Sequence, residues 1–435
     1  MTLLQPERAF GRRRVLAAIA LAVIAFVVYN ANLRPIAEGD SFPARYLPLA
    51  IWRTGTLHLE LFDKAMNTGY GLVYWTMPSR GHEVSRYPIV TPLLVTPLYA
   101  PAAYYLSGTG WDSRRVKKVS GAMEKLSASL IAAVSAAVMY LVLIGMASPR
   151  TALILTIAYA FGTNTWVTGS QALWQHGTGE LLLVIVLYAA PRAAERARWS
   201  NVAGICCALM AFNRPADGMI AIAVSAYFVL QAKTWKPFLL TAATTSAAWL
   251  AYNIVVYGAV TGGYASMNPG HYATDTMLDG VAGLLVSPTK GLFVFSPFLL
   301  LLLASSPKRF PEATQKRMAV LLLAGLICEL IVYSRTQWAG GFCFGPRYFS
   351  GSLPAMIWLI APLVDSMKRP LRFAVVALIA VAIAFQAAGA FYYPSSGMDV
   401  VYAREHWTLW HPKYNTVLRD FRAGRIGQTM FDDSE

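Results

Sequence analysis

Two adjacent stretches decide the fold class: VLAAIALAVIAFVVYNA at residues 15–31, and NLRPIAEGDS at residues 32–41, which follows it directly. An uncharged run of this length is long enough to cross the hydrocarbon core of a bilayer as a helix. Four arginines between residues 8 and 14 precede the run, and no small-residue cleavage site follows it. These features predict a retained anchor helix with its N-terminus in the cytoplasm and the polar segment 32–41 outside.

The apolar character continues along the chain. Of its 435 residues, 56% are hydrophobic and only 14% are charged, whereas globular proteins have about a quarter charged residues. We therefore predict an all-α, polytopic membrane protein with about 11 transmembrane helices, the first of them at 15–31. The other apolar runs lie at about 126–147, 151–164, 177–190, 201–213, 215–231, 237–257, 291–305, 318–334, 351–364 and 372–391.

The run at 89–107 is ambiguous, because it is apolar but contains three prolines. If it crossed the membrane, every later loop would invert and three basic clusters would face outwards, against the positive-inside rule. We predict a re-entrant or interfacial helix here. The transmembrane domain is then 1–391, with a long external first loop at about 32–125 that carries juxtamembrane helices. A later external loop at about 260–290 and a short external tail at 392–435 complete the topology.

The charge and the cysteines exclude some partners. A formal charge of +15, from 37 Lys and Arg against 22 Asp and Glu, would suggest nucleic acid in a soluble protein. Here most basic residues lie in short loops between apolar runs, as topology signals do, so no nucleic-acid partner is expected. The four cysteines show no CxxC and no metal-ligand spacing, which indicates neither a disulfide framework nor a zinc site.

Glu38 and Asp40 place two carboxylates at the external membrane surface, directly after the first span. An ionised carboxylate there is able to take a proton from an attacking hydroxyl or to hold a cation. Gly39 between them favours a tight turn that presents Asp40. A solvated cap at a helix end is the alternative interpretation.

Basic residues in the same loop suit an anionic ligand. Arg45 lies in an amphipathic segment that is expected to rest in the membrane interface and expose its arginines to lipid head groups, although plain anchoring explains the pattern equally well. Further on, SRGHEVSRYP at 79–88 contains Arg86 and His82, and arginine forks suit phosphate oxygens. A solvated loop remains the alternative there.

Three later segments add candidates. His176, in QALWQHG at 171–177, sits at an external span end, and Lys290 precedes a span, where an anion sharing the helix end would balance its charge. A snorkelling lysine is the alternative for Lys290. In WAGGFCFGPRY at 338–348, three glycines permit close backbone approach to a ligand, and Arg347 enters a span, where an unpaired charge is costly. We expect a buried anionic partner for Arg347, with Trp338 and Tyr348 as neighbouring candidate substrate contacts.

No motif of a soluble enzyme is present: the chain has no GxxxxGK[ST], HExxH, GxSxG or strand-flanked GxGxxG. Four segments are instead similar to bacterial members of the GT-C superfamily of membrane glycosyltransferases, which includes protein O-mannosyltransferases and the aminoarabinose transferases of lipid A. They are LWQHG at 173–177, NRPADG at 213–218, GLLVSPTKGLFVFSP at 283–297 and WAGGFCFGPRYFSGSLP at 338–354. Asp40 after the first span and the Pro-rich apolar helix also fit this resemblance, which covers nearly the whole chain.

The resemblance implies a sugar donor carried on a polyprenyl phosphate and an inverting transfer to a lipid, glycan or protein hydroxyl, on the external face of the cytoplasmic (inner) membrane. By analogy Asp40 is the general base, with Glu38 as the other candidate. Arg347, Lys290, Arg86 and Arg45 are candidates for binding the donor phosphate, and His176, His82, Trp338 and Tyr348 for binding substrate. Some members use a divalent metal and others do not, so metal use stays open.

A polytopic transporter or flippase of a lipid-linked or anionic substrate is the main alternative, since carriers also have many spans with buried charges. Carriers usually show matching halves with broken helices. Here the external loops are asymmetric and the first is by far the longest.

Overall fold

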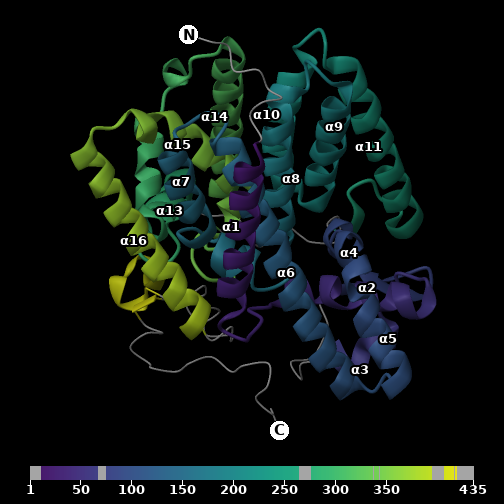
Figure 1. The fold of residues 1–435 in the computed structure, drawn as a ribbon. Helices are drawn as coiled ribbons and strands as arrows, with labels where there is room; N and C mark the ends of the chain where they lie inside the picture. Colours follow the sequence, from purple (N-terminus) through teal and green to yellow (C-terminus); the bar gives the residue numbers. More distant parts are fainter. Residues whose placement is uncertain are drawn as a thin grey trace.

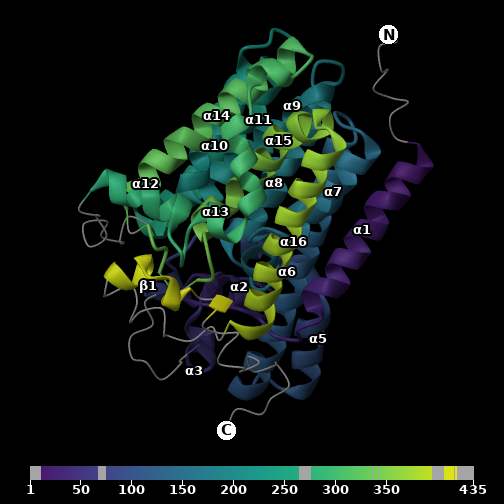
Figure 2. The same cartoon turned by 90° about the vertical axis from the view of Figure 1, so that its left-hand side faces the viewer.

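The computed structural model describes residues 11–66, 75–263, 276–336, 338–341, 343–393, 406–415 and 417–418. Parts of the predicted loop at 260–290 and of the tail at 392–435 lie outside these ranges, as does Arg8. The described chain is a bundle of helices with one small hairpin (Figures 1 and 2).

The first helix, α1 (Arg12–Asn30), runs along one side of the bundle (Figure 2). Its outer face is apolar and exposed, and Ile19, Val23 and Val27 are between 54% and 62% accessible. An apolar face of this kind is stable against lipid but not against water. Its end is joined to α6 (Ser113–Leu143) by Lys125, whose ammonium donates to the Tyr29 carbonyl at 2.6 Å.

The first loop folds into a cluster of short elements at the end of the bundle opposite the N-terminus (Figure 1). Within it, β1 and β2 form an antiparallel hairpin in which Thr76 pairs with Ser85 and Ser79 with His82. Arg80 and Gly81 make its turn with φ of 51° and 84°, the positive values that a two-residue hairpin turn requires. The elements are η2 (Gly39–Ser41), α2 (Phe42–Thr54), η3 (Glu60–Phe62), α3 (Asp63–Met66), β1 (Thr76–Ser79) and β2 (His82–Ser85).

Residues 90–109 do not form one long helix. They divide into α4 (Val90–Val95), η4 (Thr96–Tyr99) and α5 (Ala100–Thr109), and none of these is long enough to cross a membrane. Each piece has a proline near its start, where the missing amide hydrogen is tolerated. Both α4 and α5 lie in the loop cluster, as expected for a segment that does not cross (Figure 1).

The last part of the predicted first loop, up to residue 125, is helical. Helix α6 begins at Ser113, where Asp112 caps it by accepting from the Arg115 amide at 3.0 Å. Four basic residues between 114 and 118 made this stretch look like a loop, but a helix that projects beyond the membrane carries charges freely.

The remaining helices complete the bundle. Six helical segments in the described residues are long and apolar enough to cross a membrane: α1, α6, α11, α14, the segment Arg347–Ser366, and α16. The expected count of about 11 is not confirmed, because the other helices are shorter and the run at 291–305 is split. The bounds are α7 (Pro149–Phe161), α8 (Gln175–Ala189), α9 (Ala197–Asn213), α10 (Gly218–Val229), α11 (Trp235–Tyr257), α12 (Met277–Val286), α13 (Leu292–Phe295), η10 (Pro297–Ala304), α14 (Ala313–Ser334), η12 (Arg347–Ser352), α15 (Leu353–Ser366) and α16 (Arg369–Tyr392).

Candidate active site

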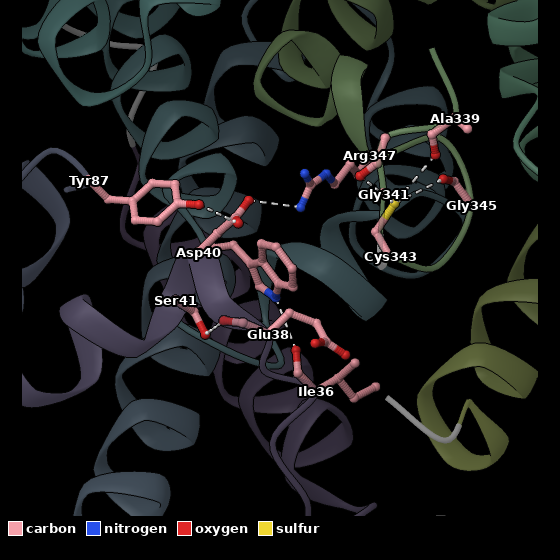
Figure 3. A network of polar contacts seen from close by, with 12 residues as sticks. Ile36, Glu38, Asp40, Ser41, Tyr87, Ala339, Gly341, Cys343, Gly345 and Arg347 are labelled. Atoms are coloured by element: carbon pink, nitrogen blue, oxygen red, sulfur yellow. Dashed lines mark hydrogen bonds and ion pairs between the residues drawn. The ribbon is translucent and has the colours of Figure 1, made fainter. Parts of the chain in front are cut away.

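Asp40 is held between two partners from distant parts of the chain (Figure 3). Its Oδ1 accepts a hydrogen bond from the Tyr87 hydroxyl at 2.9 Å, and its Oδ2 pairs with the Arg347 guanidinium at 3.0 Å. The Asp40 side chain is 29% exposed and that of Arg347 is 15% exposed. Each carboxylate oxygen therefore has a fixed partner, yet the group stays accessible from outside the bundle.

The turn at Asp40 is fixed by its own backbone and by the start of α8. The Glu38 carbonyl accepts from the Ser41 amide at 2.8 Å and from its hydroxyl at 3.0 Å, which closes the turn η2. Two residues earlier, the Ile36 carbonyl accepts from the Trp174 indole at 3.0 Å. The Trp174 ring also lies under Arg347, whose guanidinium carbon is 5.1 Å from the ring centroid. Trp174 thus supports both members of the ion pair.

The glycine-rich segment before Arg347 folds back on itself. Gly340, Gly341 and Gly345 have φ of 75°, 66° and 57°, values that side chains other than glycine rarely adopt. The buried ammonium of Lys290 donates to the Cys343 carbonyl and reaches the Gly341 carbonyl at 3.5 Å. Lys290 thus has backbone carbonyls as partners and places its ammonium inside this loop.

The NRPADG motif supports the residues that follow Arg347. Arg214 donates at 3.0 Å both to the Asp217 carboxylate and to the Tyr348 carbonyl. Asp217 is buried and packs against Gly351. A Cβ on Gly351 would lie 2.6 Å from the Oδ1 of Asp217, so no larger residue fits there. The motif therefore fixes the start of the helix that carries Arg347.

Tyr87 is positioned by the end of the hairpin. The Ser85 hydroxyl donates to the Tyr87 carbonyl at 2.7 Å and accepts from the Tyr87 amide at 3.0 Å. Between them, the Arg86 amide donates to the Trp75 carbonyl at 2.9 Å. The sequence predictions did not include Tyr87 or Trp174. The signal for Tyr87 was its place between Arg86 and Pro88, directly before the predicted re-entrant helix.

Some predicted residues lie near this pair. Glu38 is two residues from Asp40, but its side chain runs away from the Asp40 carboxylate (Figure 3). His176 is buried two residues after Trp174, with its ring centroid 6.3 Å from that indole. Tyr348 follows Arg347 and stacks on Tyr333 at 4.4 Å. The buried Nε atoms of Arg86 and Arg347, and the Nδ1 of His176, have no hydrogen-bond partner in the described part of the chain.

Other predicted site residues form hydrogen bonds with partners other than Asp40 and Arg347. Arg45 was expected to be exposed to lipid head groups, and this is wrong: it is only 8% exposed and its Nε donates to the buried Glu124 carboxylate at 2.6 Å. Burial lowers the pKa of the Arg45 guanidinium, but Glu124 together with Tyr46 and Tyr99 raises it by more, so the net shift is upward. Trp338 donates to Asp279 at 2.8 Å, and His82 lies in β2 against Glu60.

Comparison with known proteins gives one informative likeness. No family model matches the chain, and no curated protein matches its sequence. The crystal structure of ArnT from Cupriavidus metallidurans bound to undecaprenyl phosphate matches with a TM-score of 0.54 at 12% identity. The match covers 87% of this chain and 65% of ArnT, so the chain spans about two thirds of the length of that protein. The likeness shows the fold, which is the GT-C-like membrane architecture that the sequence resemblance implied.

Proposed function

We propose that this chain is a membrane glycosyltransferase that moves a sugar from a polyprenyl-phosphate donor to a hydroxyl of a lipid, glycan or protein. The transfer takes place on the external face of the cytoplasmic membrane and inverts the anomeric centre. One observation carries the proposal: on a GT-C-like fold, an accessible aspartate after the first span is joined to an arginine from the last third of the chain.

Asp40 acts as the general base. It takes the proton of the acceptor hydroxyl while that oxygen forms a bond to the anomeric carbon. The bond between this carbon and the phosphate oxygen breaks, and the polyprenyl phosphate leaves with the electron pair. Because the two oxygens of Asp40 are held by Tyr87 and Arg347, the carboxylate keeps one orientation, which favours proton transfer from a positioned acceptor.

Arg347 and Arg86 bind the donor phosphate. The Nε–H groups of both are buried, and neither has an acceptor among the described residues. Phosphate oxygens suit arginine forks, and positive charge stabilises the leaving group as the glycosidic bond breaks. The ammonium of Lys290, which contacts the Gly341 carbonyl of the glycine-rich segment, adds positive charge. Undecaprenyl phosphate is the ligand in the ArnT crystal structure, which supports a lipid of this class as the donor carrier.

Asp40→Asn in reconstituted liposomes tests the proposal. Wild-type and variant proteins are offered a panel of polyprenyl-phosphate sugars and a membrane-lipid extract, and sugar release is followed by mass spectrometry. We expect the wild type to consume one donor and Asp40→Asn to lose at least about 1,000-fold in rate, because the proton no longer has a base. Donor binding should persist in the variant, which retains Arg347.

Glu38→Gln is the matched control, since it removes a nearby carboxylate that points away from Arg347 (Figure 3). It should retain most of the wild-type rate. Equal rates for wild type and Asp40→Asn would reject Asp40 as the base. Transport of the intact donor lipid across the liposome membrane, with no sugar release by the wild type, would reject glycosyl transfer and favour a carrier.

A further inference from the structure

His58, Glu60 and His82 lie close together in the loop cluster. This group does not include Asp40 or Glu38. The Nδ1 of His82 lies 2.8 Å from the Glu60 Oε1, and the Nδ1 of His58 lies 3.9 Å from the same oxygen. The potential ligand atoms of the three side chains all lie within 4.8 Å of one another. The two imidazole rings face each other with centroids 3.6 Å apart and planes at 12°.

The backbone brings these three residues together. His58 forms an isolated antiparallel bridge with Val84, and the Leu59 amide donates to the Glu83 carbonyl at 2.8 Å. The segment of His58 and Glu60 is therefore added to the edge of β2, which carries His82. The arrangement joins two segments that are more than 20 residues apart in the chain, and it uses main-chain bonds that do not depend on the side chains.

The donor set selects a class of metal. Two imidazole nitrogens and one carboxylate oxygen are the ligands of many three-residue zinc sites, whereas calcium and magnesium prefer oxygen alone. With zinc at about 2.0–2.1 Å from each ligand, tetrahedral ligand atoms are about 3.3 Å apart. The observed 2.8 and 3.9 Å lie on either side of that separation. The two stacked imidazole rings must also turn out of their near-parallel arrangement, so that both nitrogen lone pairs point at the ion.

Two further features fit a metal site. The second carboxylate oxygen of Glu60 accepts from the Glu83 amide at 3.1 Å, and such outer hydrogen bonds orient a ligating carboxylate. The side chains of His58, Glu60 and His82 are 32%, 37% and 46% exposed, which leaves room for a water molecule as the fourth ligand. We propose that these three residues bind one divalent transition-metal ion, zinc by the chemistry of the donors.

The ion would act as a clamp on the hairpin. It would join residues 58–60 to β2, and β2 leads directly to Ser85 and Tyr87, which contacts Asp40. This inference does not rest on glycosyl transfer, because zinc binding is measured without donor or acceptor. The absence of a cysteine motif is compatible with it, since no thiolate takes part.

Zinc binding by the full-length protein tests the inference. The protein is purified in detergent with a tag that contains no histidine, stripped with EDTA, and titrated with Zn²⁺ against a chromophoric chelator. Wild type is expected to bind one equivalent and to show a higher Tm with Zn²⁺ but not with Mg²⁺. His58→Ala and His82→Ala should each weaken Zn²⁺ binding by about 100-fold, because two protein ligands hold zinc poorly.

His411→Ala is the matched control, since His411 is an exposed histidine outside the cluster, and it should bind Zn²⁺ like the wild type. Glu60→Gln preserves the shape of the side chain and should still weaken binding, which keeps the test decisive if an alanine variant unfolds. The inference is overturned if the wild type takes up no zinc, or if its affinity is unchanged in His82→Ala and Glu60→Gln.

Discussion

Asp40 has a different partner for each of its two oxygens, and this division assigns different roles to the neighbouring side chains. Tyr87 reaches the carboxylate from the end of the hairpin, whereas Arg347 reaches it from the glycine-rich segment. The tyrosine contributes one neutral hydrogen bond and the arginine contributes charge as well. Substitutions of the two residues should therefore change different kinetic constants.

Tyr87→Phe removes only the hydrogen bond to Asp40. We expect kcat to fall by about 5-fold, because a hydrogen bond contributes about 1 kcal/mol and this one orients the proposed base. The KM for the donor should stay close to the wild-type value. Steady-state kinetics of sugar release measure both constants, and Tyr105→Phe, on the half-exposed face of α5, is the control. An unchanged kcat would mean that Arg347 alone orients the carboxylate.

Arg347→Lys keeps the positive charge but loses the planar fork. Donor kcat/KM should fall by about 100-fold, since lysine cannot hold Asp40 and a phosphate oxygen with separate N–H groups in fixed geometry. The same kinetic assay measures the loss. Arg53→Lys serves as the control, because Arg53 is exposed in α2 and stacks on Trp111. Wild-type kinetics in Arg347→Lys would show that a point charge is sufficient.

The sequence analysis named Asp40 and Arg347 as candidate site residues, but it did not name the side chains that contact them. Asp40 and Arg347 were predictable because charged residues at the ends of apolar runs need a partner or a function. Tyr87 and Trp174 were not, since interfacial aromatic residues are common and their sequence positions are uninformative. Arg45 was assigned to lipid because no sequence pattern links it to Glu124, which is 79 residues away.

Among the elements, the contact between α12 and α14 depends on a glycine. A Cβ at Gly280 would lie 2.1 Å from the Ser334 carbonyl oxygen, which is backbone and cannot move away cheaply. Gly280→Ala should therefore destabilise the protein by about 1–3 kcal/mol through overpacking. Thermal unfolding in a single detergent measures this as a lower Tm.

Gly121→Ala, within α6, is the matched substitution, because nothing lies within 4 Å of its added Cβ. It should leave the Tm unchanged or raise it slightly, since alanine favours helix over glycine by about 1 kcal/mol. Equal losses of stability in both variants would show that the close approach at Gly280 relaxes without strain.

The hairpin of β1 and β2 is the element that the sequence analysis missed. The hairpin was missed because its strands, TMPS and HEVS, are four residues long, mostly polar and without hydrophobic alternation. It is specified by the Arg80–Gly81 turn and by pairing with a distant segment at His58. The run at 89–107 was predicted as one helix that does not cross, and the division of 90–109 into three pieces was not predicted, although the prolines near the start of each piece are a local signal for it.

For the whole molecule, the membrane class could be predicted from the composition and the apolar runs, and the fold from the resemblance of four sequence segments to a known family. The number of spans could not be fixed in this way. Short apolar helices such as α7 and α10 have the same composition as spans but not their length. Hydropathy shows how apolar a segment is, but the length of regular helix within that segment depends on packing. The number of spans therefore does not follow from hydropathy alone.

Binding of the lipid phosphate should stabilise the whole bundle. A ligand that binds only the folded state raises Tm in proportion to the logarithm of its concentration above Kd. We expect undecaprenyl phosphate to raise the Tm of the wild type, and undecaprenol, which lacks the phosphate, to do so much less. Arg347→Ala should lose most of the difference between the two lipids. If both lipids stabilise the wild type equally, the phosphate is not recognised.

Asp40 and Arg347 are 307 residues apart in the chain, so they are synthesised at different times. Ribosomes add about 5–20 residues per second, so Arg347 is added to the chain roughly 15–60 s after Asp40. During that interval the first loop contains only one member of the Asp40–Arg347 pair. If the two residues act together as proposed, a nascent chain that stalls before the glycine-rich segment has an incomplete site and is inactive.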